Sequence, residues 1–423
     1  MKFPTLPVLT QRVWVSALLA LLALLSYFNF DSTQMQGLIP NYIDFAHFFR
    51  SGMDLDSPFR TGQTTFPMWG YGLVLATAWP KWLIILLQQS ANLLFLIWLD
   101  KQLLALGYRE RARNAFRWLT FFAWPWHLMH AVLWPYSIGA LGISIGILCL
   151  FRFLKGGNWK FAVSAGIVLG ITSNFRSDYT FFILLATSLV ALFSWWKTKK
   201  AIGFSIPLIS LLFLLPWMIY SKQRTGHLLL TSTNAGHTFF CGLGQLNNNV
   251  WGIQPVDEDS TMRAIARPFG GTLSYAGDSV LKMAWKDSVM AHPFEFVKKM
   301  GSVAVFRLAP RPFNAGGMMD PVLDHSALPK NPSKFGFRFF LTGLTIVFGF
   351  VWFVAGIVAL GIWLFRSNKQ PWEWLALSLL GFQIALVLGA IFMPPYHTNI
   401  FWFYALFFLH PSVNFSLKNR GTN

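Results

Sequence analysis

Charged residues and cysteine are both scarce in this chain of 423 residues. Only 12% of the residues are charged, while 54% are hydrophobic and 17% are aromatic. A typical soluble domain has about 25% charged residues, so this composition excludes soluble, disordered and fibrous proteins. The two cysteines, Cys149 and Cys241, fall in an apolar run and a polar segment. We therefore expect neither a disulfide framework nor a cysteine-based metal site.

Several common catalytic motifs are also missing. The sequence contains no H-E-x-x-H, Walker A or G-x-G-x-x-G pattern, and no internal repeat. Zinc protease, ATPase and dinucleotide-dependent functions therefore lack support.

Basic residues outnumber acidic ones by 34 to 16, which gives a net charge of +18. In a soluble domain such an excess would indicate nucleic-acid binding. Here most cations fall in short stretches between apolar runs, where they record membrane orientation and contact anionic lipid headgroups. We expect membrane lipids as partners and no nucleic acid.

Apolar runs long enough to cross a bilayer recur along the chain and predict an all-α polytopic membrane protein of about ten helices. The first run follows a basic flank and is predicted to be an uncleaved helix rather than a signal peptide. The predicted helices cover residues 12–30, 82–105, 116–134, 135–154, 160–176, 177–196, 202–221, 337–365, 373–394 and 398–414.

The short basic segments all fall on one side of the membrane if these helices alternate. That side is cytoplasmic by the positive-inside rule, which indicates a multi-pass protein of a bacterial inner membrane with both termini inside. The cations concerned are Lys2, Arg12, Arg109, Arg111, Arg113, Arg117, Arg152, Lys155, Lys160, Lys197, Lys199, Lys200, Arg366, Lys369, Lys418 and Arg420.

Three regions follow from this arrangement. Residues 1–221 form an N-terminal transmembrane module whose first outer segment is 31–81. Residues 222–336 form a large outer region carrying short helices, predicted at 278–292 and at 293–308, where Pro293 is tolerated in the first turn. Residues 337–423 supply the C-terminal transmembrane helices.

The first outer segment carries a concentration of carboxylates. Asp44 lies in an apolar helical pattern that would hold it against the membrane surface. A carboxylate in such a place has a raised proton affinity and suits a general base, although a helix cap or a solvated loop aspartate would look the same. Asp54 and Asp56 form a D-x-D pair that can hold a divalent cation with substrate phosphates, or simply belong to a turn before Ser57.

Further polar side chains are predicted at the same outer level. Arg176 and Asp178 fall at a helix junction, where they either pair with each other or leave the guanidinium for an anionic lipid phosphate. The remaining candidates for phosphate or sugar contacts are Arg224, His237, Tyr396 and His397, with His127 and His130 inside the third predicted span.

Several of these elements together resemble a known superfamily. They are Y-I-D-F-A-H-F-F at 42–49, T-F-P-M-W-G-Y at 65–71, N-F-R-S-D-Y at 174–179, S-T-N-A-G-H at 232–237, M-A-H-P-F-E-F at 290–296 and P-P-Y-H at 394–397. In this order the chain resembles the GT-C superfamily of integral-membrane glycosyltransferases, which includes protein mannosyltransferases and lipid A aminoarabinose transferases.

The resemblance implies a GT-C-like helix bundle and an inverting transfer of sugar from a polyprenyl-phosphate donor to a glycan, lipid or protein acceptor on the outer face. The family's base is an acidic residue in the first outer loop, which corresponds to Asp44. The family often has two adjacent acids there, whereas this sequence reads Ile43-Asp44-Phe45, so Asp54 and Asp56 stay as alternatives. No resident metal is expected, and a divalent cation is optional.

Three other functions stay open. The main alternative is a membrane transporter or a flippase for lipid-linked sugars. Transporters typically show repeat symmetry and ionisable groups at mid-membrane, and no such symmetry is present here. A polysaccharide ligase or polymerase and a structural membrane subunit are the other possibilities.

Overall fold

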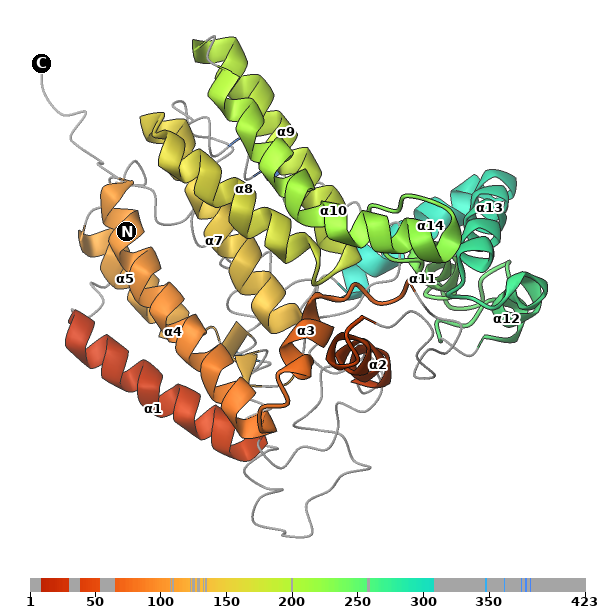
Figure 1. The fold of residues 1–423 in the computed structure, drawn as a ribbon, viewed down its shortest axis with the longest axis horizontal. Coiled ribbons are helices and arrows are strands. Elements are labelled where there is room, and N and C mark those ends of the chain that lie inside the picture. The colour runs from red at the N-terminus through yellow and green to blue at the C-terminus, as the bar shows by residue number, and fades with distance from the viewer. Residues whose placement is uncertain are drawn as a thin grey trace, which may run out of the picture.

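We describe the fold from a computed structural model of the chain. It describes residues 9–307 apart from a few gaps, and six separate residues of the C-terminal part. The gaps are 30–38, 54–64, 107, 109, 122, 124–125, 128–129, 132, 134, 199–200 and 257–258, and the separate residues are 347, 361, 374, 377, 378 and 381. Over these residues the protein is all-helical, with 13 α-helices, two short 3₁₀ helices and no strand (Figure 1).

The longest helices between residues 9 and 225 form the main bundle (Figure 1). They are α1 (Gln11–Asn29), α4 (Lys81–Ala105), α7 (Pro135–Gly156), α8 (Trp159–Ser173), α9 (Ser177–Thr198) and α10 (Ser205–Thr225). Among the described residues, four segments are long and apolar enough to span a membrane: Lys81–Ala105, Pro135–Gly156, Ser177–Trp196 and Ala201–Thr225. The predicted helices at 82–105, 135–154, 177–196 and 202–221 are therefore confirmed. The helices predicted at 12–30 and 160–176 correspond to α1 and the shorter α8, while those beyond 336 lie outside the described helices.

The predicted continuous helix at 116–134 is wrong. Instead, α5 (Glu110–Phe121) ends early, Ala123 lies outside any helix, and Leu133 lies in a bend before α7 begins. Hydropathy measures how strongly a segment prefers a membrane environment, and it carries no information on whether the helix is continuous. The apolar run at 116–134 therefore predicted one helix where the structure has a break.

Close packing of α7, α8 and α10 forms the centre of the bundle. A side-chain carbon on Gly170 of α8 would lie 2.8 Å from the backbone of Ser210 on α10, so only glycine allows this approach. Small residues at such contacts are typical of helices that associate within a membrane. The surrounding core is apolar and includes Leu96, Leu150, Leu169 and Ile183.

The two ends of the bundle differ in character. At one end α4 and α7 finish together, because Arg152 donates to the side chain of Gln102 at 2.9 Å and Lys155 donates to the carbonyl of Ala105 at 3.1 Å. We call this the basic end. At the opposite end α7 and α9 begin and α8 and α10 finish. Two short helices, α2 (Ile39–Arg50) and α3 (Gly70–Ala76), pack against each other near this end (Figure 1).

The chain beyond α10 forms a group of helices with a separate core. These are α11 (Ala235–Leu243), α12 (Ser260–Ala266), α13 (Tyr275–Ala291) and α14 (Pro293–Arg307). Phe240, Leu243, Met262 and Leu281 are buried together at its centre. The helices predicted at 278–292 and 293–308 are confirmed as α13 and α14, and Ser274 caps α13 by accepting a hydrogen bond from the backbone N–H of Gly277.

Candidate functional site

Asp44 lies on α2 with its side chain partly buried. Its helical neighbours Phe45 and Phe48 are buried in an aromatic cluster with Trp217 and Tyr220 of α10. Within the described part of the chain, the carboxylate makes no hydrogen bond or ion pair. Burial raises the pKa of Asp44 above its ordinary value, and the nearby His47 opposes this shift. The result is a carboxylate with increased basicity, as a general base requires.

The helix junction predicted to carry an arginine and an acid lies between α8 and α9. Arg176 and Asp178 form an ion pair, with 2.8 Å between Nε and Oδ1, which confirms that they pair with each other. The guanidinium also stacks over the ring of Tyr136, 3.6 Å from its centroid. The second oxygen of Asp178, Oδ2, is buried without a hydrogen bond. A buried carboxylate oxygen left in this state is a costly arrangement and has an unused acceptor.

Hydrogen bonds join α3 to this junction. The indole N–H of Trp69 donates to Oδ1 of Asn174 at 2.9 Å, and the backbone N–H of Gly70 donates to the carbonyl of Asn174 at 2.8 Å. Asn174 precedes Arg176 by two residues. The first outer segment predicted from the sequence is thus fixed beside the Arg176–Asp178 pair.

The start of the long outer region reaches the same place. Ser177 and Ser232 both donate to the side-chain oxygen of Asn234, at 3.3 and 2.8 Å. The hydroxyls of Thr65 and Thr233 are 2.8 Å apart. Three segments that are distant in the sequence, around residues 65–70, 174–178 and 232–234, therefore meet at one end of the bundle.

The other predicted site residues fall into two groups. Arg224 lies in the last turn of α10, one turn beyond Tyr220 of the aromatic cluster, and His237 lies in the first turn of α11. Asp54, Asp56, Tyr396 and His397 lie outside the described residues. In the part of the chain that the structure describes, no group of three or more His, Cys, Asp or Glu side chains is arranged to hold a metal ion.

A buried polar network, which the sequence did not predict, surrounds the interruption between α5 and α7. Gln88 and Gln89 of α4 donate their amide N–H groups to the carbonyls of His130 and His127, at 3.3 and 3.2 Å. His127 and His130 themselves have helical backbone conformation. The two amides are additional donors to their carbonyls, as polar backbone groups away from water require.

His127 is held in one tautomer by this network. Asn92 accepts from the indole of Trp126 at 2.7 Å, so its amide nitrogen faces Nδ1 of His127 at 3.1 Å. Nδ1 must then accept, and Nε2 carries the proton that it donates to the carbonyl of Thr120 at 2.8 Å. His130 differs, because its Nδ1 contacts the hydroxyl of Ser137 at 2.7 Å while its Nε2 is buried without a hydrogen bond.

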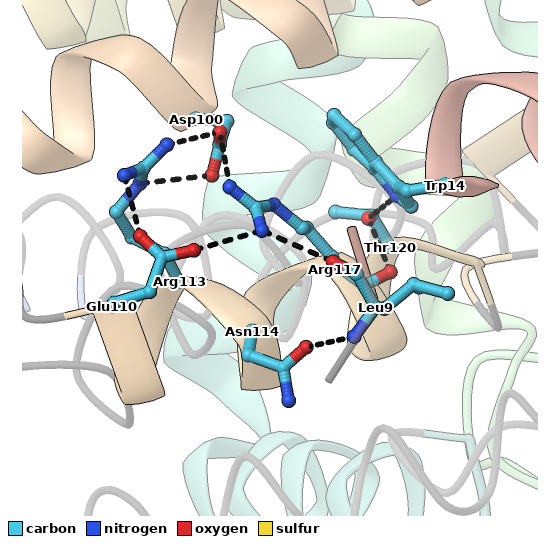
Figure 2. Close-up of polar contacts among 8 residues, drawn as sticks. All are labelled: Leu9, Trp14, Asp100, Glu110, Arg113, Asn114, Arg117 and Thr120. Carbon is cyan, nitrogen blue, oxygen red and sulfur yellow. Dashed lines mark hydrogen bonds and ion pairs between the residues drawn. The ribbon is translucent and has the colours of Figure 1, made fainter. Parts of the chain in front are cut away.

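A cluster of ion pairs at the basic end joins α4 to α5 (Figure 2). Asp100 of α4 is fully buried and binds both Arg113 and Arg117, which in turn bind Glu110. Arg113 and Arg117 therefore form ion pairs with an aspartate inside a membrane-spanning helix. They also belong to the excess of basic residues at this end. Asp100 could have been noticed in the sequence as the one carboxylate inside an otherwise apolar run.

The chain was also compared with known proteins. No protein-family model, curated protein or solved structure matches it.

Proposed function

We propose that the protein is an inverting glycosyltransferase that moves a sugar from a polyprenyl-phosphate donor to an acceptor at the extracytoplasmic face of the membrane. The observation that carries this proposal is Asp44, a partly buried carboxylate with a raised pKa and no hydrogen bond or ion pair to another described residue. It lies at the end of the bundle opposite the basic end, where the positive-inside rule places the outside.

The proposed step uses Asp44 as the general base. Asp44 takes the proton of the acceptor hydroxyl, whose oxygen attacks the anomeric carbon from the face opposite the phosphate. The bond between that carbon and the phosphate oxygen breaks, and the electron pair leaves with the lipid phosphate. One carboxylate is sufficient because the configuration inverts in a single displacement.

The leaving phosphate gains negative charge in this step, and cationic groups stabilise it. Arg176 is the proposed main contact, because its guanidinium is already oriented by Asp178 and Tyr136. Arg224 and His237 are proposed further contacts with phosphate or sugar, and Tyr396 and His397 belong to the same proposal. A divalent cation held by Asp54 and Asp56 would share this role, but a monophosphate donor does not require it.

Membranes containing the protein and a panel of polyprenyl-phosphate sugars would test the proposal. Mass spectrometry should show that the wild type consumes one donor and releases the polyprenyl phosphate. Asp44→Asn should abolish this reaction while the protein inserts normally, because an amide cannot take the acceptor's proton. The matched control is Asp287→Asn, which changes an exposed aspartate on α13. Equal turnover by wild type and Asp44→Asn would refute the assignment of the base.

A transporter or lipid-linked-sugar flippase is the second candidate, and the interrupted crossing near His127 and His130 favours it. Broken helices lined by polar groups often mark transport sites within membranes. Proteoliposomes loaded with a fluorescent polyprenyl-phosphate sugar would separate the two functions. Transport that persists in Asp44→Asn and is lost in His130→Phe would support the transporter and contradict the transferase.

A further inference from the structure

The proposed reaction needs Asp44 and Arg176 at a fixed separation. The base must reach the acceptor on one side of the anomeric carbon while the arginine contacts the phosphate on the other. The two residues come from elements far apart in the sequence, α2 and the α8–α9 junction. Some contact between these elements has to set the distance.

Asn174 connects several elements at this point. Its Nδ2 donates to the carbonyls of Gly170 on α8 and Phe213 on α10, both at 3.1 Å. Its Oδ1 accepts from the indole of Trp69, and its backbone carbonyl accepts from the N–H of Gly70. One side chain and one carbonyl thereby link the two bundle helices to the first turn of α3.

Two glycines extend this link to the helix of the base. A Cβ on Gly70 would lie 2.6 Å from the carbonyl oxygen of Asn174, so α3 rests directly on the junction. A Cβ on Gly72 would lie 2.5 Å from Cβ of Phe45, the residue next to Asp44. Because both contacts involve atoms near the backbone, neither neighbour can rotate away.

We propose that Asn174 is a positioning residue that holds α3, and through α3 the helix carrying Asp44, at a set place relative to Arg176. This inference rests on the proposed function for its catalytic consequence. It assigns Asn174 no contact with the substrate. The role of Gly70 and Gly72 is to let α3 approach the junction on one side and α2 on the other.

The magnitude follows from the glycine contacts. A methyl group at Gly70 would be about 1 Å closer to the carbonyl of Asn174 than normal packing allows, so α3 must move by about that distance. A misplacement of about 1 Å between reacting groups can lower the rate by about a hundredfold. We expect Gly70→Ala and Asn174→Ala to lower kcat by about that factor, with the KM for the donor changed less than about threefold.

The matched control is Gly301→Ala on α14, where an added Cβ meets no atom within 4 Å. This variant should turn over donor like the wild type. Trp69→Phe removes the indole N–H and part of the ring system but keeps an aromatic ring in the cluster. It is the second variant, for use if Asn174→Ala does not fold. We expect it to lower kcat by about tenfold, and the Trp69→Phe/Asn174→Ala double variant to lose no more than Asn174→Ala alone.

Pulsed electron paramagnetic resonance provides a readout that does not depend on turnover. Spin labels on cysteines at Ile43 of α2 and Ile171 of α8, both exposed in the wild type, report the distance between these helices. The two native cysteines are buried. We expect a narrow distance distribution for the wild type and Gly301→Ala, and a shifted or broadened one for Asn174→Ala and Gly70→Ala.

Two results would overturn the proposal. One is a raised KM with an unchanged kcat in Asn174→Ala, which would mean that the residue affects binding alone. The other is an unchanged distance distribution in both Asn174→Ala and Gly70→Ala. If the wild type consumes no donor, the proposed function fails. The distance measurement alone then decides whether Asn174 positions α2.

Discussion

Replacing Asp100 should destabilise the protein more than replacing any surface acid, because Asp100 is buried between two arginines. Its carboxylate accepts from Nε of Arg113 at 3.1 Å, from Nη2 of Arg113 at 2.5 Å and from Nη2 of Arg117 at 3.0 Å. Asp100→Asn removes the negative charge and leaves both guanidinium groups beside a neutral amide. Removing one partner of a buried ion pair costs about 3–5 kcal/mol, and we expect a loss in this range.

Glu110→Gln is the matched control for this prediction. Glu110 contacts the same two arginines, at 2.7 Å and 2.9 Å, but its side chain is 59% exposed. Water compensates for the loss of an exposed charge, so the expected cost is at most about 1 kcal/mol. The contrast between Asp100 and Glu110 thus tests burial, because the two residues share their partners.

A third variant separates the charge from the packing. Replacing Asp100, Arg113 and Arg117 together by Leu, Met and Leu removes all the buried charges of the cluster and leaves only the exposed Glu110. Apolar replacements of a complete buried ionic group are often neutral or stabilising, so most of the loss should be recovered.

The free energy of unfolding can be measured by steric trapping in bicelles, under reversible conditions. Equal losses for Asp100→Asn and Glu110→Gln would refute the reasoning, since burial would then not decide the cost. A loss below 1 kcal/mol for Asp100→Asn would refute it as well.

Three further predictions follow from other contacts. Transfer activity should fall as the pH decreases through the raised pKa of Asp44. Because His47 lowers the pKa of Asp44, His47→Ala should move this acidic limb of the pH–rate profile to higher pH. An unchanged limb would exclude Asp44 as the titrating group. Ser274→Ala should cost about 1 kcal/mol of stability, because it removes the N-cap of α13, and an unchanged melting temperature would argue against the cap. Gly236→Ala should cost about 1–3 kcal/mol, because its Cβ would overlap the carbonyl of Asp278; calorimetry of this variant beside Gly301→Ala provides the comparison.

Local patterns predicted much of the fold. The spans at 82–105, 135–154, 177–196 and 202–221 are visible as apolar runs because each run coincides with one continuous helical segment of the structure. Helices α13 and α14 are predictable because Pro293 separates two segments with helical patterns. In both cases the information needed is contained within about twenty neighbouring residues.

The candidate site could be predicted only in part. Asp44 was selected as an acid among aromatic residues, and the pairing of Arg176 with Asp178 follows from their spacing. The role of Asn174 was invisible, because its partners Trp69 and Phe213 are distant in the sequence. The interruption before α7 was also missed, since the glutamines that donate to the backbone there are on another helix.

The two ends of the bundle differ in how completely their carboxylates are bonded. At the basic end, both carboxylates, Asp100 and Glu110, bind Arg113 and Arg117 and hold α4 to α5, although Nε of Arg117 is buried without a hydrogen bond. At the opposite end, the Asp44 carboxylate makes no hydrogen bond or ion pair to another described residue, and Oδ2 of Asp178 is buried without a hydrogen bond. Groups that only stabilise a fold gain from being fully paired, whereas groups that bind a substrate must keep atoms unpaired until it arrives. Chemistry is therefore expected at the Asp44 end, and the ion cluster is expected to contribute stability alone.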